Sequence, residues 1–157
     1  MEEKENFMRE AIKISIDSMR AGNGGPFGAV IVKDGKIIAR GFNKVTSSND
    51  PTAHAEVVAI REACNVLGSF QLTGCEIYTS CEPCPMCLGA IYWARPDKMY
   101  FANTKTDAAA IGFDDQFIYE EIALPISGRH LCTEQLLNQE ALEAFKEWEK
   151  KTNKIEY

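Results

Sequence analysis

The chain has 157 residues, 45% of them hydrophobic and 25% charged, with six cysteines and a formal net charge of −6. This length and composition are typical of a globular protein, and we expect a single domain over residues 1–157. The acidic balance without a lysine- or arginine-rich block disfavours a nucleic-acid partner, because phosphates attract positive charge. The start, MEEKENFMRE, lacks a basic, apolar leader, and no run approaches about 20 apolar residues, so we expect a cytoplasmic protein without a membrane partner.

The first half of the chain alternates helix and strand patterns. Apolar residues at helical spacing predict a helix over residues 3–21. Two β-branched runs flank Asp34-Gly35, a dipeptide that accepts the positive φ angles of a tight hairpin turn, and they predict a β-hairpin. A second helix is expected to begin after the N-cap Thr52 and to end at Gly68.

The second half continues this alternation. A short strand near residues 76–79 precedes a helix over about 83–95, which leads to a strand near 99–102. Residues 104–128 have no assignment, and residues 138–151 form a final amphipathic pattern. The order predicts a three-layer α/β arrangement with helices covering a mixed sheet.

Three cysteines gather in TSCEPCPMCLGA, residues 79–90, as Cys81, Cys84 and Cys87. Clustered thiols in a chain that is not secreted indicate a metal site or catalysis rather than a disulfide. Cys84 and Cys87 open a predicted helix, where unpaired N–H groups favour thiolates. Zinc takes about four ligands, and a catalytic zinc takes three of them from the protein.

Histidine is the ligand that this cysteine pair lacks. Of the two histidines, His54 opens another predicted helix, whereas His130 lies in GRHLC without acidic or thiol neighbours at ligand spacing and is predicted to be structural. Glu56 follows His54 by two positions, so its carboxylate would lie beside the metal without binding it. A carboxylate there can take a proton from water and pass it to a substrate nitrogen.

The cysteines alone leave other sites open. C-x-x-C after a strand is also the setting of a thioredoxin-type redox pair, which would leave His54 and Glu56 without a role. A four-ligand structural zinc would need Cys81, which we expect instead to pack at a strand end. An iron–sulfur cluster would need a fourth cysteine ligand, and no convincing candidate accompanies Cys81, Cys84 and Cys87. The remaining cysteines are expected to be buried thiols: Cys64, Cys75 and Cys132.

The combination of H-x-E with P-C-x-x-C is the signature of zinc-dependent nucleobase deaminases. TAHAE and EPCPMC, in this element order, resemble the cytidine deaminase-like family over most of the chain. Within it, GGPFGAVIVKDG, NDPTAHAEV, YTSCEPCPMCLGAIYWAR, GFDD and the terminal EY are similar to the small bacterial guanine deaminases. The resemblance implies an α/β fold of three layers, α/β/α, around a central mixed five-stranded sheet. It also implies one zinc ion per chain and hydrolysis of guanine to xanthine and ammonia.

The resemblance assigns a role to ten positions. His54, Cys84 and Cys87 would bind zinc, and Glu56 would move protons. Asp115 would handle the proton of the leaving amine, although nothing local separates it from Asp114. The partners implied are a small purine base and a second copy, in a domain-swapped homodimer whose partner C-terminal segment closes the site. The implied substrate-binding residues are Asn43, which reads the base edge, Phe27 and Trp93, which enclose its ring faces, and Ala55 and Tyr157.

These assignments have alternatives. Phe27 and Trp93 also fit an ordinary core, and Asn43 fits a turn. The tRNA adenosine deaminases and cytosine deaminases carry the same signature. The acidic balance, GFDD and IYWAR disfavour a tRNA substrate, and bulky Trp93 would narrow the pocket toward a free base.

Overall fold

The computed structural model describes residues 2–157 and divides at Asp115 into two compact units, the second of which begins at Gln116. The single domain expected over residues 1–157 stays a prediction. No helix in residues 2–157 is both long and apolar enough to cross a membrane.

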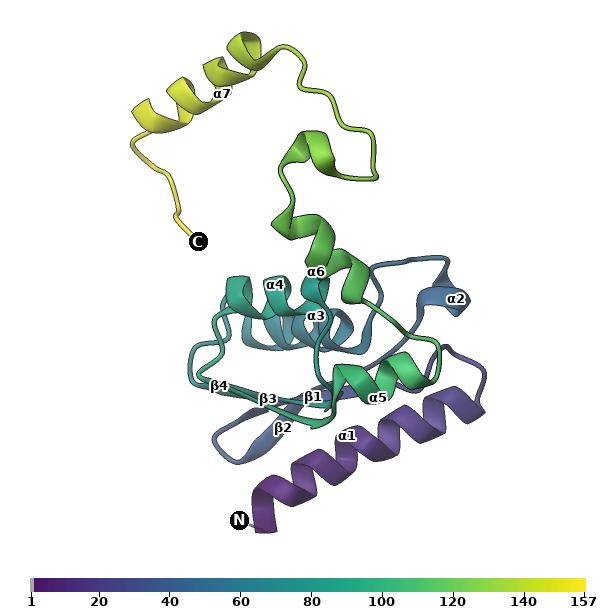
Figure 1. Cartoon of the computed structure of the whole chain (residues 1–157). Coiled ribbons are helices and arrows are strands. Elements are labelled where there is room, and N and C mark those ends of the chain that lie inside the picture. The colour runs from purple at the N-terminus through teal and green to yellow at the C-terminus, as the bar shows by residue number, and fades with distance from the viewer. Residues whose placement is uncertain (1) are drawn as a thin grey trace. The chain divides into compact units, whose positions relative to one another are not determined.

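A four-stranded mixed sheet forms the centre of the first unit, in the order β2-β1-β3-β4 (Figure 1). β1 pairs antiparallel with both β2 and β3, and β3 pairs parallel with β4. The strands are β1 (Gly28–Lys33), β2 (Lys36–Phe42), β3 (Cys75–Cys81) and β4 (Lys98–Asn103).

The expectation of a five-stranded sheet is therefore wrong for residues 2–157, which form four strands. The chain after β4 forms a helix, α5 (Lys105–Ala110), in place of a fifth strand. Thr104 and Asp107 form a capping box at its start, and three alanines follow, so local sequence favours a helix here. The α/β layering itself is confirmed.

The hairpin between β1 and β2 turns at the predicted dipeptide. Asp34 has a φ of 49° and Gly35 a φ of 70°. Both values lie in the left-handed region that a tight two-residue turn requires. A register shift between Ile31 and Val32 marks a bulge in the same hairpin.

Helices cover both faces of the sheet (Figure 1). α1 (Glu2–Arg20) packs on one face, where Ala11 joins a buried cluster with Val30 and Tyr78. α3 (Ala55–Leu67) and α4 (Pro85–Ala94) pack on the other. The buried side of α3 is made of alanines, which let its backbone approach the strands closely.

Gly41 shows how close this approach is. A Cβ at this position of β2 would collide with the carbonyl oxygen of Ala55 and would lie 2.6 Å from the amide nitrogen of Ala59. Real Cβ atoms do not make such contacts with backbone. Only glycine therefore allows α3 to lie against β2 at this height.

The start of α3 differs from the prediction. Its N-cap is His54, with φ −70° and ψ 156°, whereas Thr52 lies before the helix and donates from its amide and hydroxyl to Asp50 Oδ1 at 2.8 and 2.7 Å. Thr52 thus belongs to the turn that Asp50 stabilises, two residues before the N-cap. Gly68 ends the helix in the left-handed conformation, as predicted. A short helix, α2 (Val45–Ser48), precedes this turn.

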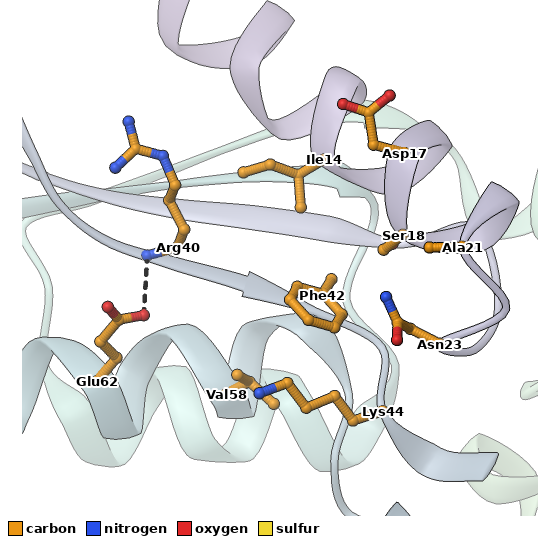
Figure 2. A pocket seen from close by; sticks show the side chains of 10 residues that line it. All are labelled: Ile14, Asp17, Ser18, Ala21, Asn23, Arg40, Phe42, Lys44, Val58 and Glu62. Atoms are coloured by element: carbon orange, nitrogen blue, oxygen red, sulfur yellow. Dashed lines mark hydrogen bonds between the residues drawn. The ribbon is translucent and has the colours of Figure 1, made fainter. Parts of the chain in front are cut away.

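The outer side of β2 is an edge of the sheet. It lines a surface pocket of about 500 Å³ together with α1 and α3 (Figure 2). The backbone N–H of Arg40 donates to Glu62 Oε2 at 3.2 Å, and the Arg40 side chain pairs with Glu10 at 2.9 Å. A side chain of α3 thus satisfies an edge donor that has no strand partner.

The second unit consists of helices and loops. α6 (Gln116–Ala123), a 3-10 turn (Ile126–Gly128) and α7 (Asn138–Lys150) follow in order, and the predicted final helix is confirmed. None of residues 116–157 is buried. Cys132 is exposed, so its expected burial is wrong, whereas Cys75 is buried and Cys64 is half-buried. Exposed apolar side chains of this unit include Phe117, Ile122, Leu136, Leu137, Phe145 and Trp148.

Candidate active site and metal centre

The ends of three strands meet at one end of the sheet. The register pairs Gly28, the start of β1, with Phe42, the end of β2, and pairs Ala29 with Thr79 near the end of β3. α3 and α4 both begin at this end, with N-caps His54 and Cys84. Neither cap residue makes a side-chain capping hydrogen bond, so both side chains are available for another purpose.

His54, Cys84 and Cys87 form the candidate metal centre. His54 Nδ1 lies 3.5 Å from Cys84 Sγ and 3.5 Å from Cys87 Sγ, and the three ligand atoms all lie within 4.8 Å of one another. Ligands at zinc–sulfur and zinc–nitrogen bond lengths in a tetrahedron are about 3.6 Å apart. The donor set therefore fits zinc, with three protein ligands and one position left for water or substrate, and the structure brings the three predicted ligands together.

Cys81 is not part of this group. Its buried thiol donates to the carbonyl oxygen of Thr104 at 3.7 Å. Burial raises the pKa of this thiol to about 11, so it is protonated at neutral pH. The arrangement agrees with the packing role expected for Cys81 and not with a four-ligand structural zinc.

The two ligand cysteines shift the pKa of one another in opposite directions. A hydrogen bond from Cys87 is the main cause that lowers the pKa of Cys84 to about 4, against the opposing effect of burial. The same hydrogen bond, together with burial, raises the pKa of Cys87. A hydrogen bond with Cys84 raises the pKa of His54. Binding of zinc must displace the Cys87 proton, because the thiolate is the ligand form.

The Glu56 carboxyl lies beside this centre. Cys87 Sγ lies 3.3 Å from Glu56 Oε2, and the Thr79 hydroxyl lies 3.2 Å from Glu56 Oε1. Burial is the largest influence on Glu56 and raises its pKa, against the opposing hydrogen bonds. A carboxyl with a raised pKa can both take and return a proton near neutral pH.

Phe27 and Asn43 flank the same end of the sheet. Asn43 is 6% exposed, and its backbone N–H donates to the Phe27 carbonyl at 3.3 Å. Its side-chain oxygen accepts from Val45 N–H at 3.1 Å, so Asn43 also stabilises a turn. Phe27 packs edge-on against Phe113, with ring centroids 4.9 Å apart. Ala55, next to His54, is fully buried.

Asp115 lies at the end of the first unit. Burial is the main cause of its raised pKa, and the negative charge of Cys84 contributes in the same direction. The Asp115 carboxyl is therefore within electrostatic reach of a metal ligand. Its neighbour Asp114 is exposed.

Trp93 lies away from the metal ligands within the first unit, and Tyr157 belongs to the second unit. Trp93 is 62% exposed near the end of α4, almost two helical turns beyond Cys87. Tyr157 is 72% exposed at the end of the second unit. Their assignments, like those of Glu56, Asp115, Asn43, Phe27 and Ala55, stay predictions.

The sequence reasoning missed Thr79 and Phe113. Thr79 belongs to a row of alternate β3 residues that face α3, and it is the one hydroxyl in that row. Phe113 lies within GFDD, in which only the two aspartates were predicted to have a role. Strand alternation signalled the first of these residues, and no local pattern signalled the second. The β3 row consists of Cys75, Ile77, Thr79 and Cys81.

Comparison with known proteins shows which family is similar to this chain in sequence and fold. The profile of the cytidine and deoxycytidylate deaminase zinc-binding region matches residues 1–103. A guanine deaminase from Bacillus subtilis is 58% identical over 153 residues, 98% of each chain. The X-ray structure of guanine deaminase from that organism superposes with a TM-score of 0.95 over 98% of each chain.

Other relatives are similar over less of the chain. A structure of guanine deaminase from Nitrosomonas europaea is 34% identical, with a TM-score of 0.67 over 69% of this chain and 63% of that chain. Solved structures at the same similarity hold 2,6-diaminopurine and 8-azaguanine. A tRNA-specific adenosine deaminase from Aquifex aeolicus is 45% identical over 99 residues, 63% of this chain and 65% of the relative.

Proposed function

The chain belongs to the cytidine and deoxycytidylate deaminase zinc-binding family, and from that premise we propose that it hydrolyses guanine to xanthine and ammonia. One observation carries the proposal: the cluster of His54, Cys84 and Cys87 with Glu56 beside it. It occurs in a chain that is 58% identical to a guanine deaminase over 98% of its length.

Glu56 is the acid–base group of the proposed reaction. Zinc held by His54, Cys84 and Cys87 supplies a Lewis acid that makes water nucleophilic near neutral pH. Glu56 takes the proton that the attacking water loses and gives it to the ring nitrogen next to the amine-bearing carbon. The remaining hydroxyl proton goes to the amine, which leaves as ammonia while the carbonyl forms. Asp115 is the second carboxyl proposed for that transfer, because the negative charge of Cys84 contributes to its raised pKa.

The proposed base site lies at the end of the sheet next to Glu56. Asn43 would bind the polar edge of the purine, as an amide carries both donors and an acceptor. Phe27 would lie against a ring face, and its contact with Phe113 restricts the movement of its own ring. Ala55 would offer the base a small surface beside His54.

The extent of the similarity favours guanine over a tRNA substrate. The likeness to the tRNA deaminase covers 99 residues, whereas the likeness to the guanine deaminase covers 153 and so includes the second unit. The net charge of −6 also disfavours binding of a polyanion.

The second unit supports a proposed homodimer with exchanged C-terminal segments. Its apolar side chains, among them Phe145 at 74% exposure and Trp148 at 44%, have no buried core of their own. Large exposed apolar groups on an amphipathic helix indicate a surface that another chain covers. In such a dimer Tyr157 would close the base site of the partner. Trp93 would lie against a ring face of the bound base.

The assay that tests the proposal is ammonia release from guanine, adenine, cytosine and an adenosine-containing tRNA anticodon loop. We expect guanine to be the preferred substrate. Glu56→Gln should keep one zinc per chain while kcat falls roughly 10²- to 10⁴-fold, the usual effect of losing a general acid–base group. Turnover of the RNA without activity on guanine would contradict the substrate. Loss of zinc in Glu56→Gln would instead make Glu56 a ligand.

A further inference from the structure

Thr79 places a hydroxyl where the packing of β3 favours an apolar side chain. Cys75 and Ile77, on the same face of the strand, join the core cluster under α3. Thr79 is 1% exposed in the same row. A valine has nearly the same shape and would fill this space without burying a polar group, which is unfavourable unless the group is hydrogen-bonded. The hydroxyl therefore needs an explanation in its partners.

The hydroxyl has two partners on opposite sides. Thr79 Oγ1 lies 3.2 Å from Glu56 Oε1 and 2.9 Å from the carbonyl oxygen of Cys81. A hydroxyl has one proton to donate and can accept at the same time. Its Oγ1 therefore lies between the Glu56 carboxyl of α3 and the backbone of β3, and its proton can be donated to either.

The other carboxyl oxygen of Glu56 has a neighbour of a different kind. Glu56 Oε2 lies 3.3 Å from Cys87 Sγ, which as a metal ligand is a thiolate without a proton to donate. Cys87 therefore cannot hold the carboxylate in a fixed rotation once the metal is bound. Thr79, on the rigid strand β3, is the side chain that can do so.

We propose that Thr79 is a positioning residue that fixes the orientation of the Glu56 carboxyl through the contact between Thr79 Oγ1 and Glu56 Oε1. The inference rests on the proposed function, in which Glu56 takes a proton from water and returns it to the base. In this role Thr79 acts through Glu56, whose carboxyl the hydrogen bond keeps in one orientation.

The test is a double-mutant cycle on guanine with Thr79→Val and Glu56→Gln. Thr79→Val should keep one zinc per chain and lower kcat about 10- to 100-fold, with KM changed less than about threefold, because an oriented hydrogen bond to a charged group is lost. Thr79→Ser keeps the hydroxyl and should retain kcat within about threefold. In the Glu56→Gln background, Thr79→Val should have almost no further effect, because Thr79 acts through the carboxylate.

Ser80→Ala is the matched control. Ser80 is the neighbouring buried hydroxyl of β3, and its Oγ accepts from Gly28 N–H at 3.0 Å. Its effect on kcat, whatever its size, should be the same in the wild-type and Glu56→Gln backgrounds.

Two results would overturn the inference without touching the proposed function. One is a kcat for Thr79→Val within threefold of wild type, and the other is an equal loss in both backgrounds. A Glu56→Gln enzyme with full activity would instead overturn the role of Glu56 itself, and so distinguishes the two failures.

Discussion

The two units of the chain differ in how much apolar surface each of them buries within itself. The first unit buries an apolar cluster on each face of its sheet and brings the three candidate metal ligands and the Glu56 carboxyl to one end of it. The second unit, residues 116–157, has regular helices but no buried residue. The sequence pattern of α7 is nevertheless clearly amphipathic. The difference shows that apolar periodicity specifies a helix face and leaves open which chain covers that face.

Removal of the metal is expected to have the largest effect, and to be confined to the first unit. Chelation, or Cys84→Ser, should abolish turnover and lower the thermal unfolding midpoint, because a ligand that binds only the folded state stabilises it by about 4 kcal/mol at 1,000 times its Kd. Calorimetry with and without a chelator measures this, and proteolysis within α7 should not change. A metal-free protein with an unchanged midpoint would contradict the coupling of the centre to the fold.

Gly41→Ala is expected to have the next largest effect. The added Cβ would collide with the Ala55 carbonyl, and α3, which carries Glu56, would have to move. Overpacking of this kind costs about 1–3 kcal/mol or more, and kcat should fall with stability. Chemical denaturation measures the loss. Gly128→Ala in the second unit is the control, because its Cβ would lie 3.7 Å from Pro125 in ordinary contact; an equal loss there would remove the contrast between the units.

Deletion of Tyr157 should affect turnover but not folding. If the partner's terminus closes the base site, the deletion should lower kcat/KM about tenfold, as loss of a closing segment does. The unfolding midpoint should stay within about 1 °C, because Tyr157 is exposed and surface changes have little effect on stability. Steady-state kinetics and calorimetry decide the point. Unchanged kinetics would exclude a role for Tyr157 in the site.

The smallest effect is expected from the ion pair of the second unit. His130 Nδ1 lies 2.6 Å from Glu121 Oε1, and this hydrogen bond raises the pKa of His130 and lowers that of Glu121. The pair should therefore stabilise its loop fully below the unfolded histidine pKa and lose this effect as pH rises through the raised value. On the acid side, the contribution fades as pH falls through the lowered pKa of Glu121.

NMR titration of the His130 imidazole measures the effect of this ion pair on its pKa. Glu121→Gln should return the imidazole toward its ordinary pKa of about 6.5, with guanine turnover unchanged. The imidazole is largely exposed, and exposed ion pairs contribute little to stability. Equal titration of His130 in both proteins would show that the pair does not form in solution.

Local signals were sufficient for much of the fold and for the metal ligands. The Asp34-Gly35 turn and the helix end at Gly68 depend on backbone conformations that few residues accept. The residue types at these positions therefore predict both features. His54, Cys84 and Cys87 were predictable because ligand chemistry and helix starts restrict the choice.

What the sequence did not reveal depends on tertiary neighbours. Thr52 has the right chemistry for an N-cap, but it lies in a turn with Asp50, and the helix begins after His54 instead. The contact of Thr79 with Glu56 joins residues from separate elements and requires the register of β3 against β1. The fifth strand was expected from family resemblance, whereas the capping box at Thr104 begins a helix.

The carboxylate of Glu62 has a consequence for the chain at high concentration. Exposed strand edges allow copies of a protein to polymerise by backbone pairing. At Arg40 the donor that an incoming strand would need is already occupied from within the same molecule (Figure 2). A second copy could extend the sheet past β2 only after displacing this side chain. The Glu62 carboxylate therefore opposes backbone pairing between copies at this position of the edge.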